Sequence, residues 1–177
     1  MNLFLIGYRG TGKTTVAELV AQQLHWSWSD ADAELEGRAG RSIAAIFAGG
    51  GETEFRDLES DVIRQLSRRD ETVIALGGGA VLRELNRDII SDHGRVVWLQ
   101  SSPEVIRERL VADASTRSRR PQLTPAGSLD EIENVLRHRA PIYAGCADYT
   151  VATDGKSPAE VAALIVTWYT LDKDSVS

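Results

Sequence analysis

The chain has little of what would place it outside the cell or in a membrane. Its 177 residues include one cysteine, Cys146, which excludes an internal disulfide and fits a reducing compartment. It has no apolar run long enough to span a bilayer, and no basic segment followed by an apolar one at its start. We therefore expect a soluble cytoplasmic protein without a membrane partner.

The chain also has fewer positive than negative charges. Lysine and arginine number 20 against 26 aspartates and glutamates, a net charge of −6, which argues against nucleic acid as a main partner. Repeats and low-complexity linkers are absent, and 42% of the residues are hydrophobic. We expect one domain over residues 1–170, large enough to bury a core, with a frayed tail at 171–177. Nothing in the composition demands an oligomer, so a monomer is expected.

Short apolar runs alternate with stretches of helical periodicity along the chain. This alternation favours a parallel sheet covered by helices on both faces, a three-layer α/β/α fold. Two of the expected helices are Lys13 to Leu24 and Leu129 to about Arg139. The five expected strands are Asn2–Ile6, Trp26–Ser29, Thr72–Leu76, Arg95–Leu99 and Tyr149–Ala152.

A glycine-rich loop joins the first strand to the first helix. Its residues Gly7 to Thr14 fit the phosphate-loop pattern G-x-x-x-x-G-K-[ST] without a mismatch. Backbone N–H groups of such a loop cradle phosphates, Lys13 can reach the β- and γ-phosphates, and the Thr14 hydroxyl can ligate Mg²⁺. The alternative, a coincidental turn, is disfavoured by the strand before the loop and the helix after it. The loop predicts a nucleotide triphosphate, yet hydrolysis, transfer and simple binding all remain open.

A pair of aspartates, Asp30 and Asp32, follows the second strand. Residues two apart on an extended segment point the same way, so both carboxylates could face the crevice at the strand ends. There they could hold a metal through water and orient or deprotonate a hydroxyl. The alternative is an N-cap for the helix that begins near Ala33.

Three consecutive glycines, Gly77 to Gly79, follow the buried strand Thr72–Leu76. Without side chains they would let a ligand approach the backbone closely. The alternative is a tight turn from strand to helix. In isolation the glycines favour the turn, and their expected place at the same sheet edge as the phosphate loop strengthens the case for a ligand.

Arginines cluster in an otherwise acidic chain. Arg117, Arg119 and Arg120 share a proline-containing loop that would suit closure over phosphates. Arg56 and Arg139 stand apart in sequence, and either could bind a carboxylate through two hydrogen bonds. The alternative for each arginine is a solvated surface charge.

Several stretches in a fixed order resemble the shikimate kinase family over nearly the whole chain. The stretch from Gly40 to Glu59, joined to the triple glycine, is the most specific of them. The stretches are GYRGTGKTTV, SDADAELE, GRSIAAIFAGGGETEFRDLE, ALGGGAV, RRPQL and RHRAPIYAGCADYTV.

The resemblance implies a kinase that uses ATP and Mg²⁺ to phosphorylate the 3-hydroxyl of shikimate, on the route to chorismate and the aromatic amino acids. It also implies a P-loop fold like that of nucleoside monophosphate kinases. In such a fold a shikimate-binding region would lie at about 31–60 and a mobile lid at about 113–125. Two positions depart from the family's usual residues: Ala31 stands where Thr or Ser is common, and Gln122 where Leu is usual.

Roles for the nucleotide-binding residues also follow from the resemblance. Thr14 and Asp30 would support Mg²⁺, Lys13 would contact the phosphates, and Arg120 would close over ATP with the lid. Because Gln122 alters the lid pattern, Arg117 and Arg119 remain candidates for that contact. The residues expected to wrap the phosphates are Gly10, Thr11, Gly12, Lys13, Thr14 and Thr15, and Thr153–Pro158 would contact the adenine.

Roles for the acceptor side are implied in the same way. Asp32 would bind shikimate hydroxyls and could accept the attacking proton. Arg56 and Arg139 would bind the carboxylate, and Gly78 and Gly79 would meet the ring. Two rival functions stay open: a P-loop kinase for another polyol acid or a nucleotide, and a catalytically silent binding module. Retention of all these residues argues against the silent module.

Overall fold

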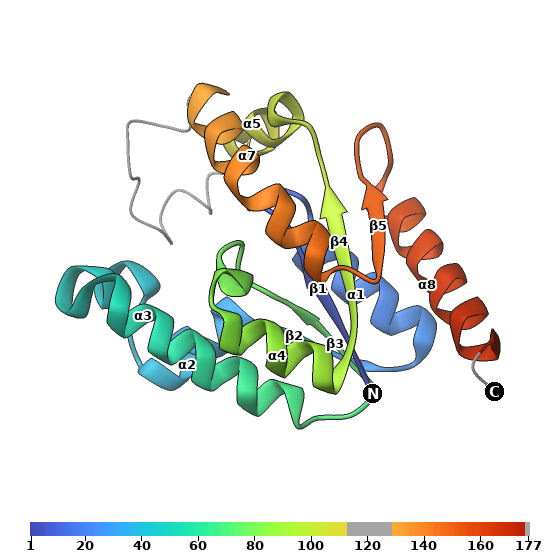
Figure 1. Cartoon of the computed structure of the whole chain (residues 1–177), viewed down its shortest axis with the longest axis horizontal. Coiled ribbons are helices and arrows are strands. Elements are labelled where there is room, and N and C mark those ends of the chain that lie inside the picture. The colour runs from blue at the N-terminus through green and yellow to red at the C-terminus, as the bar shows by residue number, and fades with distance from the viewer. Residues whose placement is uncertain (113–128, 176–177) are drawn as a thin grey trace.

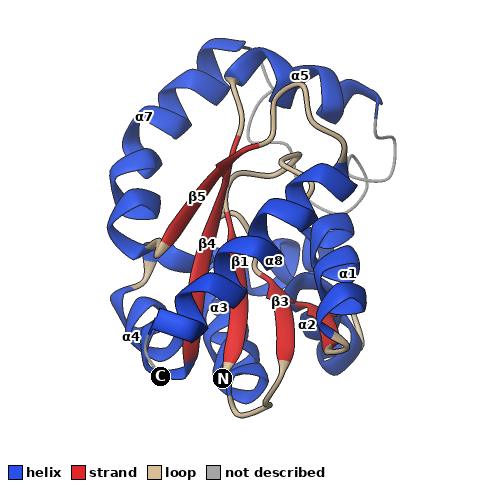
Figure 2. Cartoon of the chain, turned by 90° about the vertical axis from the view of Figure 1, so that its right-hand side faces the viewer, coloured by secondary structure: helices blue, strands red, loops and turns tan. Residues whose placement is uncertain are grey.

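The computed structural model describes residues 1–112 and 129–175, in which five parallel strands form one sheet. The strand order is β2-β3-β1-β4-β5, and helices cover both faces of the sheet (Figure 1 and Figure 2). This confirms the expected three-layer α/β/α fold. The strands are β1 (Asn2–Ile6), β2 (Ser27–Asp30), β3 (Thr72–Ala75), β4 (Gly94–Gln100) and β5 (Tyr149–Ala152).

The helices follow the strands in alternation, as the hydrophobic pattern predicts. Those of the described residues are α1 (Lys13–Leu24), α2 (Ala31–Ala39), α3 (Ile43–Ser67), the short 3₁₀ helix η1 (Ala80–Leu82), α4 (Glu84–His93), α5 (Pro103–Ala112), α7 (Leu129–Cys146) and α8 (Pro158–Ser175). None of these helices is both long enough and apolar enough to cross a membrane.

The central strand β1 shows how the sequence builds two cores. Leu3 and Leu5 point to one face of the sheet, where they pack with residues of α1 and α8. Phe4 and Ile6 point to the other face, where they pack with residues of α2, α3, α4 and α7. Because side chains alternate along a strand, an uninterrupted apolar run serves both layers at once.

The carboxyl ends of β1 and β3 lie side by side because these strands are parallel neighbours. The pairing continues one residue past the end of β3, since the Leu76 amide donates to the Leu5 carbonyl at 3.0 Å. The phosphate loop after β1 and the triple glycine after β3 therefore meet at one edge of the sheet, where open α/β sheets bind ligands.

Two helices differ from the sequence expectation. Helix α7 continues past Arg139 to Cys146 with Pro141 inside it, although proline lacks the amide hydrogen of a regular turn. The last turns retain their helical form because Tyr143, only 1% exposed, packs into the core. Helix α8 runs to Ser175, so the chain is still helical beyond residue 171, where we expected it to fray. The expected lid at 113–125, with Arg117, Arg119 and Arg120, lies outside the described residues.

Candidate active site

The phosphate loop is shaped by a close contact with the neighbouring strand. Gly7 has a φ of 138°, and a Cβ atom there would lie 2.4 Å from the carbonyl oxygen of Leu99. A side chain at this position would force the loop away from β4. The loop ends at Gly12, which caps α1 in a left-handed conformation with φ 87°.

Lys13 lies folded back over the loop that precedes it. Its Nζ donates to the carbonyl oxygens of Gly7 and Tyr8 at 2.9 and 2.8 Å. Thr11 is buried and its hydroxyl donates to the same Tyr8 carbonyl. The first turn of α1, with Thr14 and Thr15, turns its unpaired amides and its positive dipole end toward the loop. Such an end attracts phosphate.

The two carboxylate oxygens of Asp30 make different contacts. One carboxylate oxygen caps α2, accepting from the amides of Asp32 and Ala33 at 2.9 and 3.1 Å. The other accepts a 2.6 Å hydrogen bond from the Thr14 hydroxyl. The capping prediction is thus confirmed, and the contact with Thr14 brings Asp30 to the phosphate loop.

The predicted extended position of Asp32 is wrong. Asp32 lies in the first turn of α2, so it does not share an extended segment with Asp30. The turn arises because Asp30 binds the Asp32 amide and starts the helix at Ala31. Asp32 nevertheless stays beside the phosphate loop, since its amide is bonded to the carboxylate that Thr14 contacts.

Thr14 and Asp30 fit a magnesium ion. Their two contacting oxygens are hard donors, the type that Mg²⁺ prefers. Within the described ranges no group of three or more His, Cys, Asp or Glu side chains gathers to hold a metal. The geometry therefore suits an ion that completes its shell with phosphate oxygens and water.

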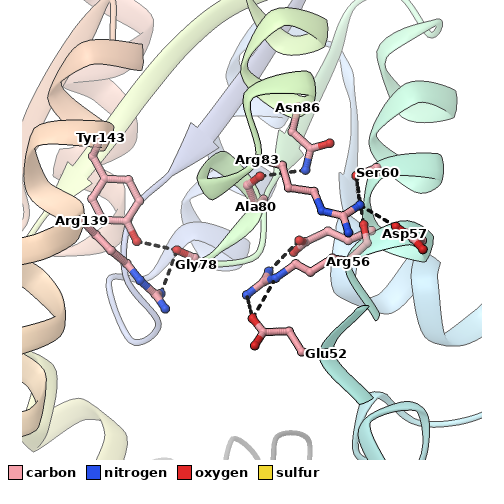
Figure 3. A network of polar contacts seen from close by, with 11 residues as sticks. Glu52, Arg56, Asp57, Ser60, Gly78, Ala80, Arg83, Asn86, Arg139 and Tyr143 are labelled. Carbon is pink, nitrogen blue, oxygen red and sulfur yellow. Dashed lines mark hydrogen bonds and ion pairs between the residues drawn. The ribbon is translucent and has the colours of Figure 1, made fainter. Parts of the chain in front are cut away.

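A cavity of about 160 Å³ opens next to the phosphate loop, between α3 and α7. Two of the predicted arginines line it, Arg56 from α3 and Arg139 from α7, and the close-up shows both directed into the space between these helices (Figure 3). The cavity is lined by Tyr8, Arg9, Phe47, Glu52, Arg56, Gly78, Gly79, Glu131, Val135 and Arg139.

Two of the three glycines, Gly78 and Gly79, form the floor of this cavity. A Cβ atom on Gly79 would lie 2.6 Å from Nη2 of Arg56, so a side chain there would push the guanidinium away. The carbonyl of Gly78 accepts from Arg139 Nη1 at 3.2 Å and from the Tyr143 hydroxyl at 2.5 Å (Figure 3). The glycines thus place backbone directly against the two arginines, as well as forming the turn into η1.

Arg56 is oriented by a carboxylate that sequence reasoning missed. Its Nη1 donates to Glu59 at 2.7 Å, and the Glu59 side chain is only 3% exposed. Glu52, one turn before Arg56, accepts from its Nε and Nη2 at 3.4 Å. The sequence could have indicated this pair, because Arg56 and Glu59 are three residues apart on one helix and such spacing brings side chains together.

Tyr143 was missed for a different reason. It lies four residues after Arg139, so both side chains share one face of α7 and meet at Gly78. We expected the helix to end near Arg139, and that early end hid the shared face.

Another unpredicted arginine, Arg109, joins the phosphate loop to the loop that follows β5. It donates to the hydroxyl and the carbonyl of Thr153 at 3.1 and 3.3 Å, and to the Gly10 carbonyl at 3.4 Å. Asp154, which follows Thr153 in the chain, accepts hydrogen bonds from the Ser101 hydroxyl and the Ser102 amide. Burial opposes its ionisation, but these hydrogen bonds outweigh burial and hold the pKa of Asp154 below its ordinary value.

The structure thus brings the predicted residues into two adjoining groups. Lys13, Thr14 and Asp30 gather at the phosphate loop, whereas Arg56 and Arg139 meet across the glycines in the cavity. Asp32 stands beside the first group and is not among the described residues that line the cavity.

A phosphate loop beside a compact arginine-lined pocket, on a five-stranded parallel sheet, defines a P-loop kinase of the small-molecule class. The comparisons make this more specific. The family model described as shikimate kinase matches residues 9–170. The chain belongs to the shikimate kinase family.

Individual relatives agree with the family model. The chain is 46% identical to the shikimate kinase of Rhodopirellula baltica over 160 residues, 90% of this chain and 86% of the relative. It is 41% identical to that of Nitratidesulfovibrio vulgaris over 86% of each chain. A solved shikimate kinase from Acinetobacter baumannii in complex with shikimate is 32% identical and superposes with a TM-score of 0.90, covering 97% of this chain and 94% of the other.

The Arg56–Glu59 pair generates a stability prediction. Glu59→Gln should lower the free energy of unfolding by about 3 kcal/mol, because it leaves a largely buried guanidinium without its main counter-charge. Asp61→Asn is the matched control on the same helix: Asp61 and Arg64 also pair at i,i+3 but are exposed, so the loss should stay below about 1 kcal/mol. Urea unfolding measures both, and equal losses would contradict the structural role of Glu59.

Proposed function

We propose that this chain transfers the γ-phosphate of ATP to the 3-hydroxyl of shikimate, giving shikimate 3-phosphate and ADP. The observation that carries the proposal is the pocket in which Arg56 and Arg139 meet across Gly78 and Gly79, next to the phosphate loop. Two guanidinium groups in a cavity of about 160 Å³ suit a single small ring with one carboxylate. A nucleoside monophosphate is larger and would need its own phosphate site.

On the donor side, the loop amides from Gly10 to Thr15 bind the ATP phosphates and Lys13 contacts the β- and γ-phosphates. Arg109 and the loop from Thr153 frame the adenine end. Thr14 and Asp30 would hold Mg²⁺, which would supply neutralisation of the phosphate charge. Arg120, in the lid predicted at 113–125, adds a further cation over the phosphates.

On the acceptor side, Arg56 and Arg139 bind the carboxylate and thereby fix the ring against the glycine backbone. Asp32 hydrogen-bonds the ring hydroxyls and orients the one that reacts. The acceptor oxygen forms a bond to Pγ while the bond from Pγ to the bridging oxygen of ADP breaks, and the hydroxyl proton passes to the Asp32 carboxylate. Most of the rate enhancement then comes from positioning and charge neutralisation.

The proposal extends to the setting of the enzyme. We place it in the cytoplasm as a monomer of one domain, with no nucleic-acid partner. A single cysteine and a net charge of −6 support this placement.

ADP release in a coupled assay tests the proposed activity. Shikimate should support turnover with ATP and Mg²⁺, whereas gluconate and nucleoside monophosphates should not. If turnover requires one of these other acceptors, or no acceptor supports it, the proposed function is wrong.

The role of Asp32 makes a separate prediction. Asp32→Asn should lower kcat about 10²- to 10⁴-fold, because the amide cannot take the hydroxyl proton. ATP affinity, measured by calorimetry, should change little, since Lys13 and the loop amides are intact. A near-normal kcat in this variant would exclude Asp32 as the proton acceptor.

Arg56 and Arg139 together form the proposed carboxylate clamp. Loss of one of them should affect the KM for shikimate and leave the KM for ATP nearly unchanged. Arg139→Ala should raise the KM for shikimate about 10- to 100-fold, as expected when a charge-assisted hydrogen bond is lost, and the KM for ATP less than about threefold. Arg68→Ala is the control, because Arg68 is an exposed arginine that does not line the cavity. A parallel rise in both KM values would refute the clamp.

A further inference from the structure

The phosphate loop carries a cation that lines the cavity between α3 and α7. Arg9 belongs to this loop, two residues after Gly7, yet it lines the cavity with Arg56 and Arg139. Three arginines therefore surround a space of about 160 Å³. Two of them suffice for the single carboxylate of shikimate, so the third calls for its own explanation.

The three arginines differ in what they contact. Arg56 is paired with Glu52 and Glu59, and Arg139 donates to the Gly78 carbonyl. Arg9, in contrast, has a buried Nε without a hydrogen-bond partner. Its contact within the described part of the chain is the ring of Tyr8, whose centroid is 5.8 Å from the Arg9 Cζ.

An unpartnered donor of this kind is costly. Arg9 as a whole is half-buried, but its Nε is withdrawn from water, and a buried N–H donor without an acceptor destabilises the fold. Retaining such a group beside a ligand cavity makes sense if an anion completes its contacts in the working enzyme. The anion then decides the role of the residue.

The position of Arg9 indicates which anion it meets. Lys13 Nζ, the group that contacts the nucleotide phosphates, lies 2.8 Å from the Tyr8 carbonyl, in the peptide unit that contains the Arg9 amide. On its other side, the Arg9 amide nitrogen lies 3.3 Å from where a Cβ on Gly78 would be. Arg9 therefore links the donor loop to the floor of the acceptor cavity.

We propose that Arg9 binds the phosphoryl group on the acceptor side as it is transferred, and then the phosphate of the product. This inference rests on the proposed shikimate kinase activity. As Pγ leaves the bridging oxygen of ADP and bonds to the shikimate oxygen, negative charge moves from the Lys13 side toward the cavity. The planar guanidinium of Arg9 receives it through paired N–H donors, while the hydroxyl proton still goes to Asp32.

Two ligands that differ only in the phosphate separate this role from carboxylate binding. In Arg9→Gln, calorimetry should show shikimate 3-phosphate bound about 10- to 100-fold more weakly than by the natural protein, with shikimate affinity changed less than about threefold. In turnover, kcat should fall about 10²-fold with little change in the KM for shikimate. Arg9→Lys retains the charge but not the paired donors. Its kcat and its affinity for shikimate 3-phosphate should lie between those of the natural protein and those of Arg9→Gln.

Arg64→Met is the control for loss of one arginine charge, because Arg64 is exposed and does not line the cavity. This substitution should change neither the affinity for shikimate nor that for shikimate 3-phosphate. Equal weakening of shikimate and shikimate 3-phosphate by Arg9→Gln or Arg9→Lys would overturn the proposal, because it would assign Arg9 to the carboxylate. Unchanged affinities and kcat would overturn it too. Turnover by the natural protein is measured first: its absence refutes the proposed function, whereas its presence with unaffected Arg9 variants refutes only this inference.

Discussion

The close approach of the backbone at Gly78 to the phosphate loop is the constraint on which the site depends. A Cβ at Gly78 would lie 3.3 Å from the Arg9 amide and 3.4 Å from the Gly7 carbonyl, so the two loops nearly touch. The parallel pairing of β1 with β3 creates this contact, and the Gly78 carbonyl then anchors Arg139 and Tyr143 from α7. Donor and acceptor sites adjoin because these loops do.

The same arrangement explains how an acidic protein can bind two anionic substrates. The arginines of the cavity are concentrated at one sheet edge, and the carboxylates near them are used to orient guanidinium groups, as Glu59 does for Arg56. Local charge and not net charge decides what binds there. Arg9 differs in having no carboxylate partner among the described residues, which is why we assign it to a charge that arrives only with the transferred group.

Much of this could be predicted from the sequence, because it depends on local pattern. The apolar runs fixed the five strands, the phosphate-loop motif located Lys13 and Thr14, and the glycines after β3 marked the cavity floor. The failures depended on tertiary packing at α7 and on the local helix cap formed by Asp30. The core position of Tyr143 carries α7 past Pro141, and the cap formed by Asp30 moves Asp32 from strand to helix. Contacts such as those of Arg109 with Thr153 join residues 44 apart in sequence, which no local pattern reveals.

Substitution of one cavity-floor glycine tests the central claim most directly. Gly79→Ala adds only a methyl group, but at a point 2.6 Å from Nη2 of Arg56. The KM for shikimate should rise at least about tenfold, the loss expected for a displaced charge-assisted hydrogen bond, while the KM for ATP stays within about threefold. Gly37→Ala is the matched control, because a Cβ there meets nothing within 4 Å. An unchanged KM for shikimate in Gly79→Ala would contradict the account.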